Sequence, residues 1–163
     1  VEVGDVPRRR RGEHLNPKKE AEMYLYRDPE GRPCVPAINI KACLRDGGRN
    51  YRVRGRRSTF AAMIRAGIDV EPPYVPILDP DTNELAKWEV DYRPVVVQRQ
   101  RIMRARPRFN RWKLAFRIIN KDPDVIKRDI LRQIVEDAGK WVGLGDFRPE
   151  FGLFKLIKFE LEQ

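Results

Sequence analysis

The chain has 163 residues, a formal net charge of +10, and 41% hydrophobic and 36% charged residues. A chain of this length is a single domain in the first instance and buries about two thirds of its unfolded surface, so its fold needs no disulfide or metal. No apolar run approaches the roughly 20 residues of a membrane span and no signal peptide is evident, which argues against membrane-spanning and secreted proteins. The positive charge favours nucleic acid, an anionic membrane surface or an acidic protein as the partner.

The N-terminal stretch, residues 1–14, carries four consecutive arginines at positions 8–11 and no apolar periodicity. We expect a flexible basic arm, whose functional interpretation is that its arginines add phosphate contacts. His14, the only histidine, lies in this arm. The sequence then predicts a single domain over residues 15–163, with a basic loop at about residues 48–58.

Three short helices are predicted in the first half of the domain. Asn16-Pro17 provides a cap and then a proline at the first helical position, which predicts a helix over residues 17–26. The second helix starts at Pro36 and stops at Gly47-Gly48. Ser58 is expected to cap the third helix, over residues 59–66. The apolar stripe of the second helix consists of Ala37, Ile40, Cys43 and Leu44.

The two cysteines, Cys34 and Cys43, lie nine residues apart without a second pair, which excludes the common zinc-binding patterns. Cys43 falls on the apolar side of a predicted helix and is expected to be a small core residue. A disulfide between the two is the alternative, and it suits an intracellular protein less well. We therefore predict a reduced cytoplasmic protein with no metal and no cofactor.

The second half of the chain alternates strands with one helix. Apolar alternation predicts strands over residues 95–103 and 112–119, joined by a connection at residues 104–111. Asp122-Pro123-Asp124 is expected to cap a long amphipathic helix that ends near Gly139 or Trp141, and a last strand follows over residues 153–161. The apolar stripe of this helix consists of Ile126, Ile130, Leu131, Ile134, Val135 and Ala138. This order, preceded by helices, predicts an α+β fold in which an antiparallel sheet is covered by helices on one face. A modified ferredoxin-like or RNA-recognition-like arrangement is its commonest form.

The segment Tyr92 to Lys121 holds eight arginines, two lysines and no acid, so its charge of +10 equals that of the whole chain. Same-side residues two apart on a strand are about 7 Å apart, close to the phosphate spacing of an extended single strand. We expect Arg99 and Arg101 to share one strand face. Lys113 and Arg117 are expected to lie about 13–14 Å apart on the next strand. A solvated edge is the simpler alternative.

A glycine-rich stretch covers residues 143–152. Its glycines either form a tight helix-to-strand reversal at positive φ or let backbone amides approach a phosphate. Phe147 and Arg148 offer a stacking face and a charge in the same stretch. The Gly-Lys-Ser/Thr run of a mononucleotide site is missing, and the stretch follows a helix rather than preceding one. The glycines concerned are Gly143, Gly145 and Gly152.

Residues that could carry catalysis are few. Asp79, Asp81 and Glu84 lie in one proline-flanked loop, with Asp91 after it, and carboxylates so spaced could share a hard cation. A solvated turn is the simpler interpretation. His14 has no evident partner for general-base chemistry. We predict that the protein is not an enzyme, with a metal-dependent nuclease as the minority alternative.

The run from Arg32 to Arg45 resembles the signature of the RAMP superfamily, whose members include the guide-RNA-binding backbone subunits of CRISPR effector complexes. The match covers Val35-Pro36, Lys41 and Leu44-Arg45, and the glycine-rich stretch before the last strand resembles a second family motif. The whole chain also resembles a group of phage proteins of unknown function. These resemblances imply a modified RNA-recognition fold, RNA or single-stranded DNA held as copies assemble along it, and a prokaryotic or virus-infected cell. They imply backbone contacts for Lys41 and Arg45.

The sequence thus predicts sequence-tolerant, non-enzymatic binding of RNA or single-stranded DNA in a basic groove between two segments, by a homo-oligomer or a subunit of a ribonucleoprotein-like complex. The alternative is a viral or complex-forming adaptor whose basic face docks an acidic protein. No membrane partner is predicted. The candidate binding residues are Lys41, Arg45, Arg49, Arg52, Arg54, Arg56, Arg57, Arg99, Arg101, Arg104, Arg106, Lys113, Arg117, Phe147 and Arg148.

Overall fold

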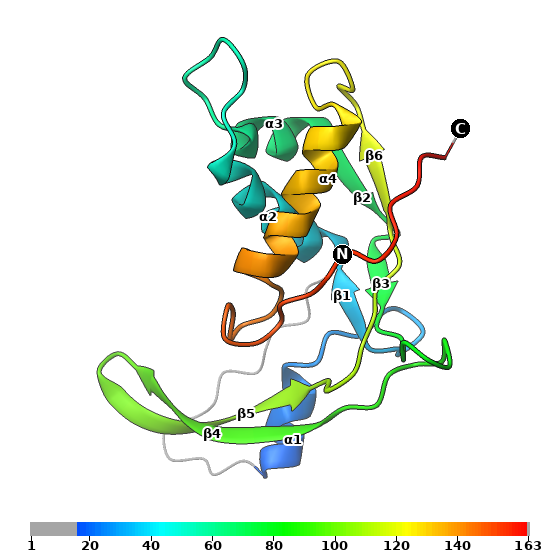
Figure 1. The fold of residues 1–163 in the computed structure, drawn as a ribbon. Coiled ribbons are helices and arrows are strands. Elements are labelled where there is room, and N and C mark those ends of the chain that lie inside the picture. Colours follow the sequence, from blue (N-terminus) through cyan, green and yellow to red (C-terminus); the bar gives the residue numbers. More distant parts are fainter. Residues whose placement is uncertain (1–15, 163) are drawn as a thin grey trace. The chain divides into compact units, whose positions relative to one another are not determined.

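The computed structural model describes residues 16–162, so the expected basic arm and His14 lie outside the described residues (Figure 1). The sequence predicts one domain, whereas the contacts within the chain group its residues into two compact units. Of the described residues, unit 1 contains 16–35 and 76–115, and unit 2 contains 36–75 and 116–162. The chain passes between the units three times: in β1 (Cys34–Pro36), in β3 (Tyr74–Pro76) and between Ala115 and Phe116.

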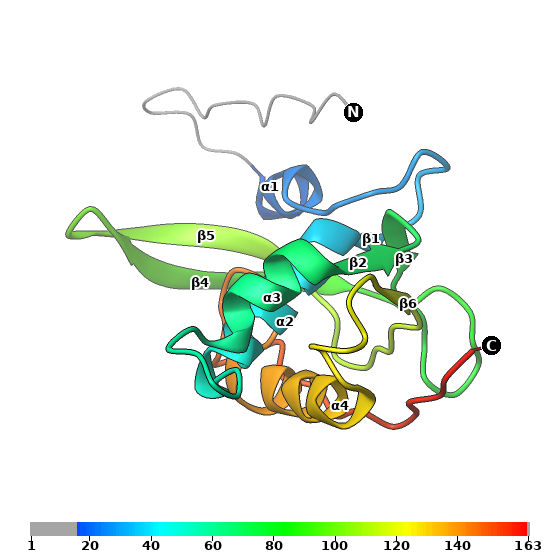
Figure 2. The same ribbon diagram turned by 90° about the horizontal axis from the view of Figure 1, so that it is seen from above.

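Unit 1 begins with α1 (Pro17–Met23), which ends three residues earlier than predicted. The predicted cap is confirmed, because the Asn16 side chain accepts a hydrogen bond from the Lys18 N–H at 2.9 Å. Glu20 and Ala21 are the buried residues of this helix. They lie on a helix that packs against β5 of the same unit, as Figure 2 shows.

A long antiparallel hairpin makes up most of unit 1. Its strands are β4 (Glu89–Val97) and β5 (Gln100–Arg108), paired from Glu89 opposite Arg108 to Val97 opposite Gln100. Gln98 and Arg99 form the turn at φ values of 49° and 65°. Positive φ at both central residues is the conformation that joins strands with right-handed twist through a two-residue loop. The predicted strand over residues 95–103 is therefore wrong: it is two strands with a turn in the middle.

This hairpin also corrects the expected connection at residues 104–111. Residues up to Arg108 belong to β5, and Pro107 lies inside that strand. A proline is tolerated there because each strand of a two-stranded ribbon has a free edge that needs no N–H donor. The sequence signal was misread because proline was taken as the end of a strand.

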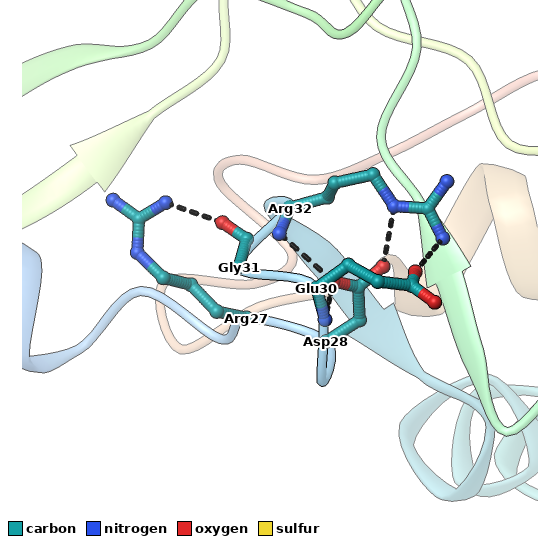
Figure 3. Close-up of polar contacts among 5 residues, drawn as sticks. All are labelled: Arg27, Asp28, Glu30, Gly31 and Arg32. Atoms are coloured by element: carbon teal, nitrogen blue, oxygen red, sulfur yellow. Dashed lines mark hydrogen bonds and ion pairs between the residues drawn. The ribbon is translucent and has the colours of Figure 1, made fainter.

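The turn that follows α1, at residues 28–31, is organised by Asp28. Its Oδ1 accepts hydrogen bonds from the N–H groups of Glu30 and Arg32, at 3.0 and 2.8 Å, and its Oδ2 accepts one from Arg32 Nε at 2.7 Å (Figure 3). Burial acts to raise the pKa of Asp28, but the hydrogen bonds from the Arg32 backbone and guanidinium outweigh it and hold the pKa below its usual value. Arg32, within the RAMP-like run, is thus a structural residue.

Unit 2 is built on α2 (Ala37–Gly47), the short 3₁₀ turn Gly48–Asn50 and α3 (Phe60–Gly67). The predicted stripe is confirmed, since all four of its residues are buried. Helix α3 lacks the expected cap: its N-cap is Thr59 rather than Ser58, without a side-chain hydrogen bond. Gly47 must be glycine, because a Cβ there would lie 2.9 Å from Cβ of Ala138.

Two strands of unit 2 pair antiparallel. They are β2 (Ile68–Glu71) and β6 (Arg117–Asn120), from Ile68 opposite Asn120 to Glu71 opposite Arg117. The predicted strand over residues 112–119 is only partly correct. Lys113 forms an isolated bridge to Leu78 in unit 1, and the ladder starts only at Arg117. Lys113 and Arg117 therefore do not share a strand.

Helix α4 (Arg128–Asp137) continues into a π-helical turn, Ala138–Val142. It starts later than predicted, because the Asn120 side chain donates to the Ile126 carbonyl at 2.7 Å and holds the preceding residues as a loop. The predicted apolar stripe is otherwise correct. Its buried members are Ile126, Leu131, Ile134, Val135 and Ala138.

The last predicted strand, over residues 153–161, is not a strand. Residues 153–161, all of which the structure describes, form neither helix nor strand. The described strands form three separate two-stranded sheets. The predicted α+β class is confirmed, and the ferredoxin-like arrangement is not. Among residues 16–162, no helix has the length and apolar character needed to cross a membrane.

Candidate nucleic-acid interface

An arginine cluster lies in unit 2 along residues 45–65, with Asp46 as the single acid of that range. Its members are Arg45, Arg49, Arg52, Arg54, Arg56, Arg57 and Arg65. They extend from the end of α2 through the following loop to the last turn of α3. Seven cations against one carboxylate leave this stretch strongly positive.

Part of the cluster lines an open groove of about 480 Å³ between α2 and α3. The charged lining is Arg45 and Arg49 on one side and Arg65 on the other. The rest of the lining consists of Ala61, Ala62 and Ala66. Alanines leave the arginine side chains room to reach a ligand, and they supply no competing acceptor.

The one carboxylate is shared by two of these arginines. Asp46 Oδ1 lies 3.1 Å from Arg45 Nε and 3.2 Å from Arg49 NH2. A single negative charge cannot neutralise two guanidinium groups, and such partly exposed pairs are weak in water. The groove therefore keeps a net positive charge, which Arg65 increases.

Four more arginines of the cluster lie on a tight loop before α3. The loop is closed by hydrogen bonds from the Val53 N–H to the Ser58 carbonyl and from the Arg56 N–H to the Val53 carbonyl, both 3.0 Å. Gly55 turns it at a φ of 76°, and buried Val53 anchors it. Its exposed guanidinium groups have no partner among residues 16–162. They belong to Arg52, Arg54, Arg56 and Arg57.

The base of this loop is fastened to α4. The Tyr51 hydroxyl donates to Asp137 Oδ2 at 2.5 Å, and this hydrogen bond is the main reason that the pKa of Tyr51 rises to about 12. The Tyr51 carbonyl accepts from the Phe60 N–H at 2.9 Å, which ties the start of α3 to the same point. The sequence interpretation missed Tyr51, Asp137 and Arg65. Only Arg65 left a signal, as the cation on the polar side of a predicted helix.

Lys41, expected to contact a nucleic-acid backbone, pairs with a carboxylate of its own unit. Its Nζ lies 3.2 Å from Asp69 Oδ1, and Lys121 Nζ lies 3.1 Å from Asp69 Oδ2. The hydrogen bonds from Lys121 and then Lys41 hold the pKa of Asp69 below its usual value. These two cations are thus partly neutralised, unlike those of the loop.

The arginines along the hairpin of unit 1 are held by the unit itself. Arg93 pairs with Asp91 at 2.8 Å. The Arg104 guanidinium lies 3.6 Å from the buried Glu20 carboxylate and donates to the Tyr24 hydroxyl at 3.3 Å. The Arg106 guanidinium lies 3.6 Å from the centre of the Tyr24 ring, a cation–π contact.

The register explains this arrangement. Arg104 lies opposite Arg93, and Arg106 lies opposite Asp91, so all of these side chains share one face of the ribbon. The contacts of Arg104 and Arg106 with α1 show that this face carries the helix. These arginines therefore fasten α1 to the hairpin.

The hairpin tip differs from its base. Arg99 and Arg101 are exposed and have no partner within residues 16–162. They do not form the expected same-side pair on one strand, because Arg99 is a turn residue. Val96, 73% exposed, lies opposite Arg101. The tip is a small mixed surface of two cations and exposed valine.

The remaining predicted residues are engaged locally. Lys113 donates to the Asn83 side-chain oxygen. Arg117 pairs with Glu162 at 2.7 Å, and Arg148 donates to the Gly145 carbonyl at 2.9 Å. Phe147 stacks on Phe151 with ring centres 5.5 Å apart.

The glycine-rich stretch is a compact reversal. Gly143, Gly145 and Gly152 have positive φ, and the Leu144 N–H donates to the Gly152 carbonyl at 3.0 Å. A Cβ on Gly152 would lie 1.7 Å from the Leu144 carbonyl oxygen, so only glycine fits. The structural interpretation of these glycines is the one that the geometry supports.

The carboxylates considered for a nuclease have local partners. Asp79 Oδ1 accepts from the N–H groups of Asp81 and Thr82, and these hydrogen bonds lower the pKa of Asp79. Asp81 pairs with Arg111 at 2.8 Å. Within residues 16–162, no group of three or more His, Cys, Asp or Glu side chains is placed to hold a metal ion. Cys34 and Cys43 are free buried thiols, and burial raises the pKa of Cys43 to about 11.

Comparison of the chain with protein families, curated proteins and solved structures found no match. The RAMP-like run is a strand followed by a helix, β1 and then α2. Within that run, three basic residues form ion pairs: Arg32 with Asp28, Lys41 with Asp69 and Arg45 with Asp46. The candidate interface therefore rests on the arginines themselves.

Proposed function

We propose that this protein binds single-stranded RNA or DNA, without sequence preference and without catalysis, through the arginine cluster of unit 2. The observation that carries the proposal is the loop with four exposed, unpartnered guanidinium groups (within residues 16–162) next to a groove lined by three more. Guanidinium groups bind phosphates as bidentate donors, and contacts to phosphates hold a chain in place without reading its bases.

A flexible single strand suits this surface better than a duplex does. The cluster changes direction from a helix-lined groove to a tight loop within a few residues. Duplex DNA is stiff over about 150 base pairs and would touch only part of such a surface. The resemblance of the Arg32–Arg45 run to proteins that hold a guide RNA points to the same class of ligand. The basic groove expected between this cluster and the hairpin remains a prediction, because the two segments belong to different units.

Fluorescence polarisation tests the proposal. Labelled single strands of mixed and homopolymeric sequence, and a matched duplex, would be titrated with protein between 50 and 300 mM KCl. We expect similar affinities for all single strands, and log affinity falling linearly with log salt by about 0.7 for each neutralised phosphate. Absence of binding at low salt, or a flat salt response, would overturn the proposal.

Two further arms address the alternatives. Polyglutamate added as competitor should displace the oligonucleotide poorly; equal displacement would favour an acidic protein as the partner. Labelled strands incubated with Mg²⁺ or Mn²⁺ should stay intact. Cleavage that follows the protein through purification would indicate a nuclease instead.

A further inference from the structure

Residues 153–161 have a sequence that predicts a β-strand, but the structure does not pair residues 153–162 with any other strand. In a regular strand, Leu153, Ile157 and Leu161 would lie on the same side. Yet the N–H and C=O groups of residues 155–161 make no hydrogen bond to the described residues 16–162. A segment with unpaired backbone groups can serve as a template for pairing with another strand.

The segment is attached to unit 2 near both of its ends. At its start the Phe154 N–H donates to the Gly139 carbonyl at 3.0 Å, and a Cβ on Gly139 would clash with Phe154 at 2.4 Å. Near its end, Glu162 pairs with Arg117 at 2.7 Å. The first contact is the firmer one, because both partners of the Glu162–Arg117 pair are exposed.

Three exposed side chains of residues 153–162 are large and apolar. Ile157 is 85% exposed, Leu161 73% and Leu153 44%. Three such residues in one short segment are more than the scattered exposure normal for a protein surface, and they mark an interaction site.

We propose that this segment pairs antiparallel with the same segment of a second copy of the chain, around a twofold axis at Ile157. A second copy of the chain is the proposed partner because the three apolar residues are spaced symmetrically: Leu153 and Leu161 each lie four residues from Ile157. A twofold contact places residue i against j and j against i, so this spacing is self-complementary. Leu153 then meets Leu161 of the second copy, and Ile157 meets its own counterpart.

Charge agrees with this register. Lys155 lies opposite Phe159, Lys158 opposite Leu156 and Glu160 opposite Phe154, so no like charges are directly opposed. Shifting the centre to Lys158 would set two lysines against each other and place Leu161 opposite Lys155 instead of Leu153. Apolar contact and charge therefore select the same pairing.

The first test is the mass of the nucleic-acid-free protein by light scattering, so its result is independent of oligonucleotide binding. We expect a dimer at tens of micromolar, and half that mass for Ile157→Lys, which places two charges on the twofold axis. Ile38→Lys is the matched control, because Ile38 is 75% exposed but lies on α2, and it should stay dimeric. A monomeric unsubstituted protein, or equal effects of both variants, would overturn the proposal.

The second test reads the register directly. Opposed residues of an antiparallel pair have Cα atoms about 4.5–5.5 Å apart, within the reach of a disulfide. Under mild oxidant, Ile157→Cys should cross-link to a covalent dimer, while Leu153→Cys alone should not. The double variant Leu153→Cys with Leu161→Cys should cross-link again. The native thiols of Cys34 and Cys43 are buried, so they should not form cross-links between copies of the chain. Cross-linking of Leu153→Cys alone, or none with Ile157→Cys, would overturn the register.

Discussion

The hairpin of unit 1 and the arginine cluster of unit 2 are both rich in arginine, and they use it differently. Along β4 and β5, guanidinium groups contact Asp91, Glu20 and Tyr24 and fasten α1 in place. In the loop before α3, four guanidinium groups face solvent with no partner in residues 16–162. The comparison shows that local charge alone does not identify a binding surface, because what matters is which cations the fold leaves unpaired.

The largest expected effect comes from removing the loop arginines. The quadruple variant Arg52→Gln, Arg54→Gln, Arg56→Gln and Arg57→Gln should lower the salt slope by about 2.8 and affinity at 0.1 M salt at least about a hundredfold, since four phosphate contacts are lost. Polarisation across a salt series measures both. The matched control removes four exposed cations of unit 1, Lys18, Lys19, Lys87 and Arg111. An equal loss in both variants would contradict a specific role for the loop.

The hairpin base should respond in stability rather than in binding. Arg104→Met leaves the buried Glu20 carboxylate without its cation, and we expect the free energy of unfolding to fall by about 2–3 kcal/mol. Urea denaturation measures this change, with Arg101→Gln on the same strand as the exposed control. Adding Glu20→Gln should restore part of the loss. If Arg104→Met instead weakened oligonucleotide binding with stability unchanged, the contrast between the two regions would break.

The hairpin tip should give a smaller effect on binding. Arg99→Asn with Arg101→Gln removes two cations that have no partner within residues 16–162, and it keeps a residue that tolerates the left-handed turn at position 99. If the hairpin tip also contacts the bound oligonucleotide, the affinity for the oligonucleotide should fall about 25-fold at 0.1 M salt, by a similar factor for every nucleotide sequence. Gln98→Asn alters the same turn without loss of charge and serves as the control. A loss larger than that of the loop variant would reverse the ranking of the two surfaces.

The smallest effect should be a gain. Asp46→Asn removes the one carboxylate of the arginine cluster at residues 45–65 and frees Arg45 and Arg49 from it. We expect affinity at 0.1 M salt to rise about fivefold and the salt slope to steepen by about 0.7. Asp91→Asn, which removes the carboxylate paired with Arg93 in the hairpin, is the parallel change in unit 1 and should leave affinity unchanged. Equal gains would mean that both arginine sets bind.

Much of the local structure could be predicted. The stripe of α2 and the Asn16 cap are confirmed, because helical periodicity and capping act within a few residues. The hairpin was missed because Gln98 and Arg99 are unusual at positive φ, where asparagine and glycine are the recognisable signal. The last strand was mispredicted since its alternation is real but its ladder partner is not found among the described residues.

The candidate site likewise combines features that the sequence predicts with features that only the tertiary structure shows. The sequence by itself determined the α+β class, the buried faces of α2 and α4 and the clustering of arginines, since each follows from composition or short-range pattern. Only the tertiary structure decided which arginines remain open to a ligand. Arg104 is neutralised by Glu20, 84 positions earlier in the chain, and Lys41 by Asp69. Such pairs depend on distant segments meeting, whereas the loop before α3 meets no acid within residues 16–162 and keeps its charge there.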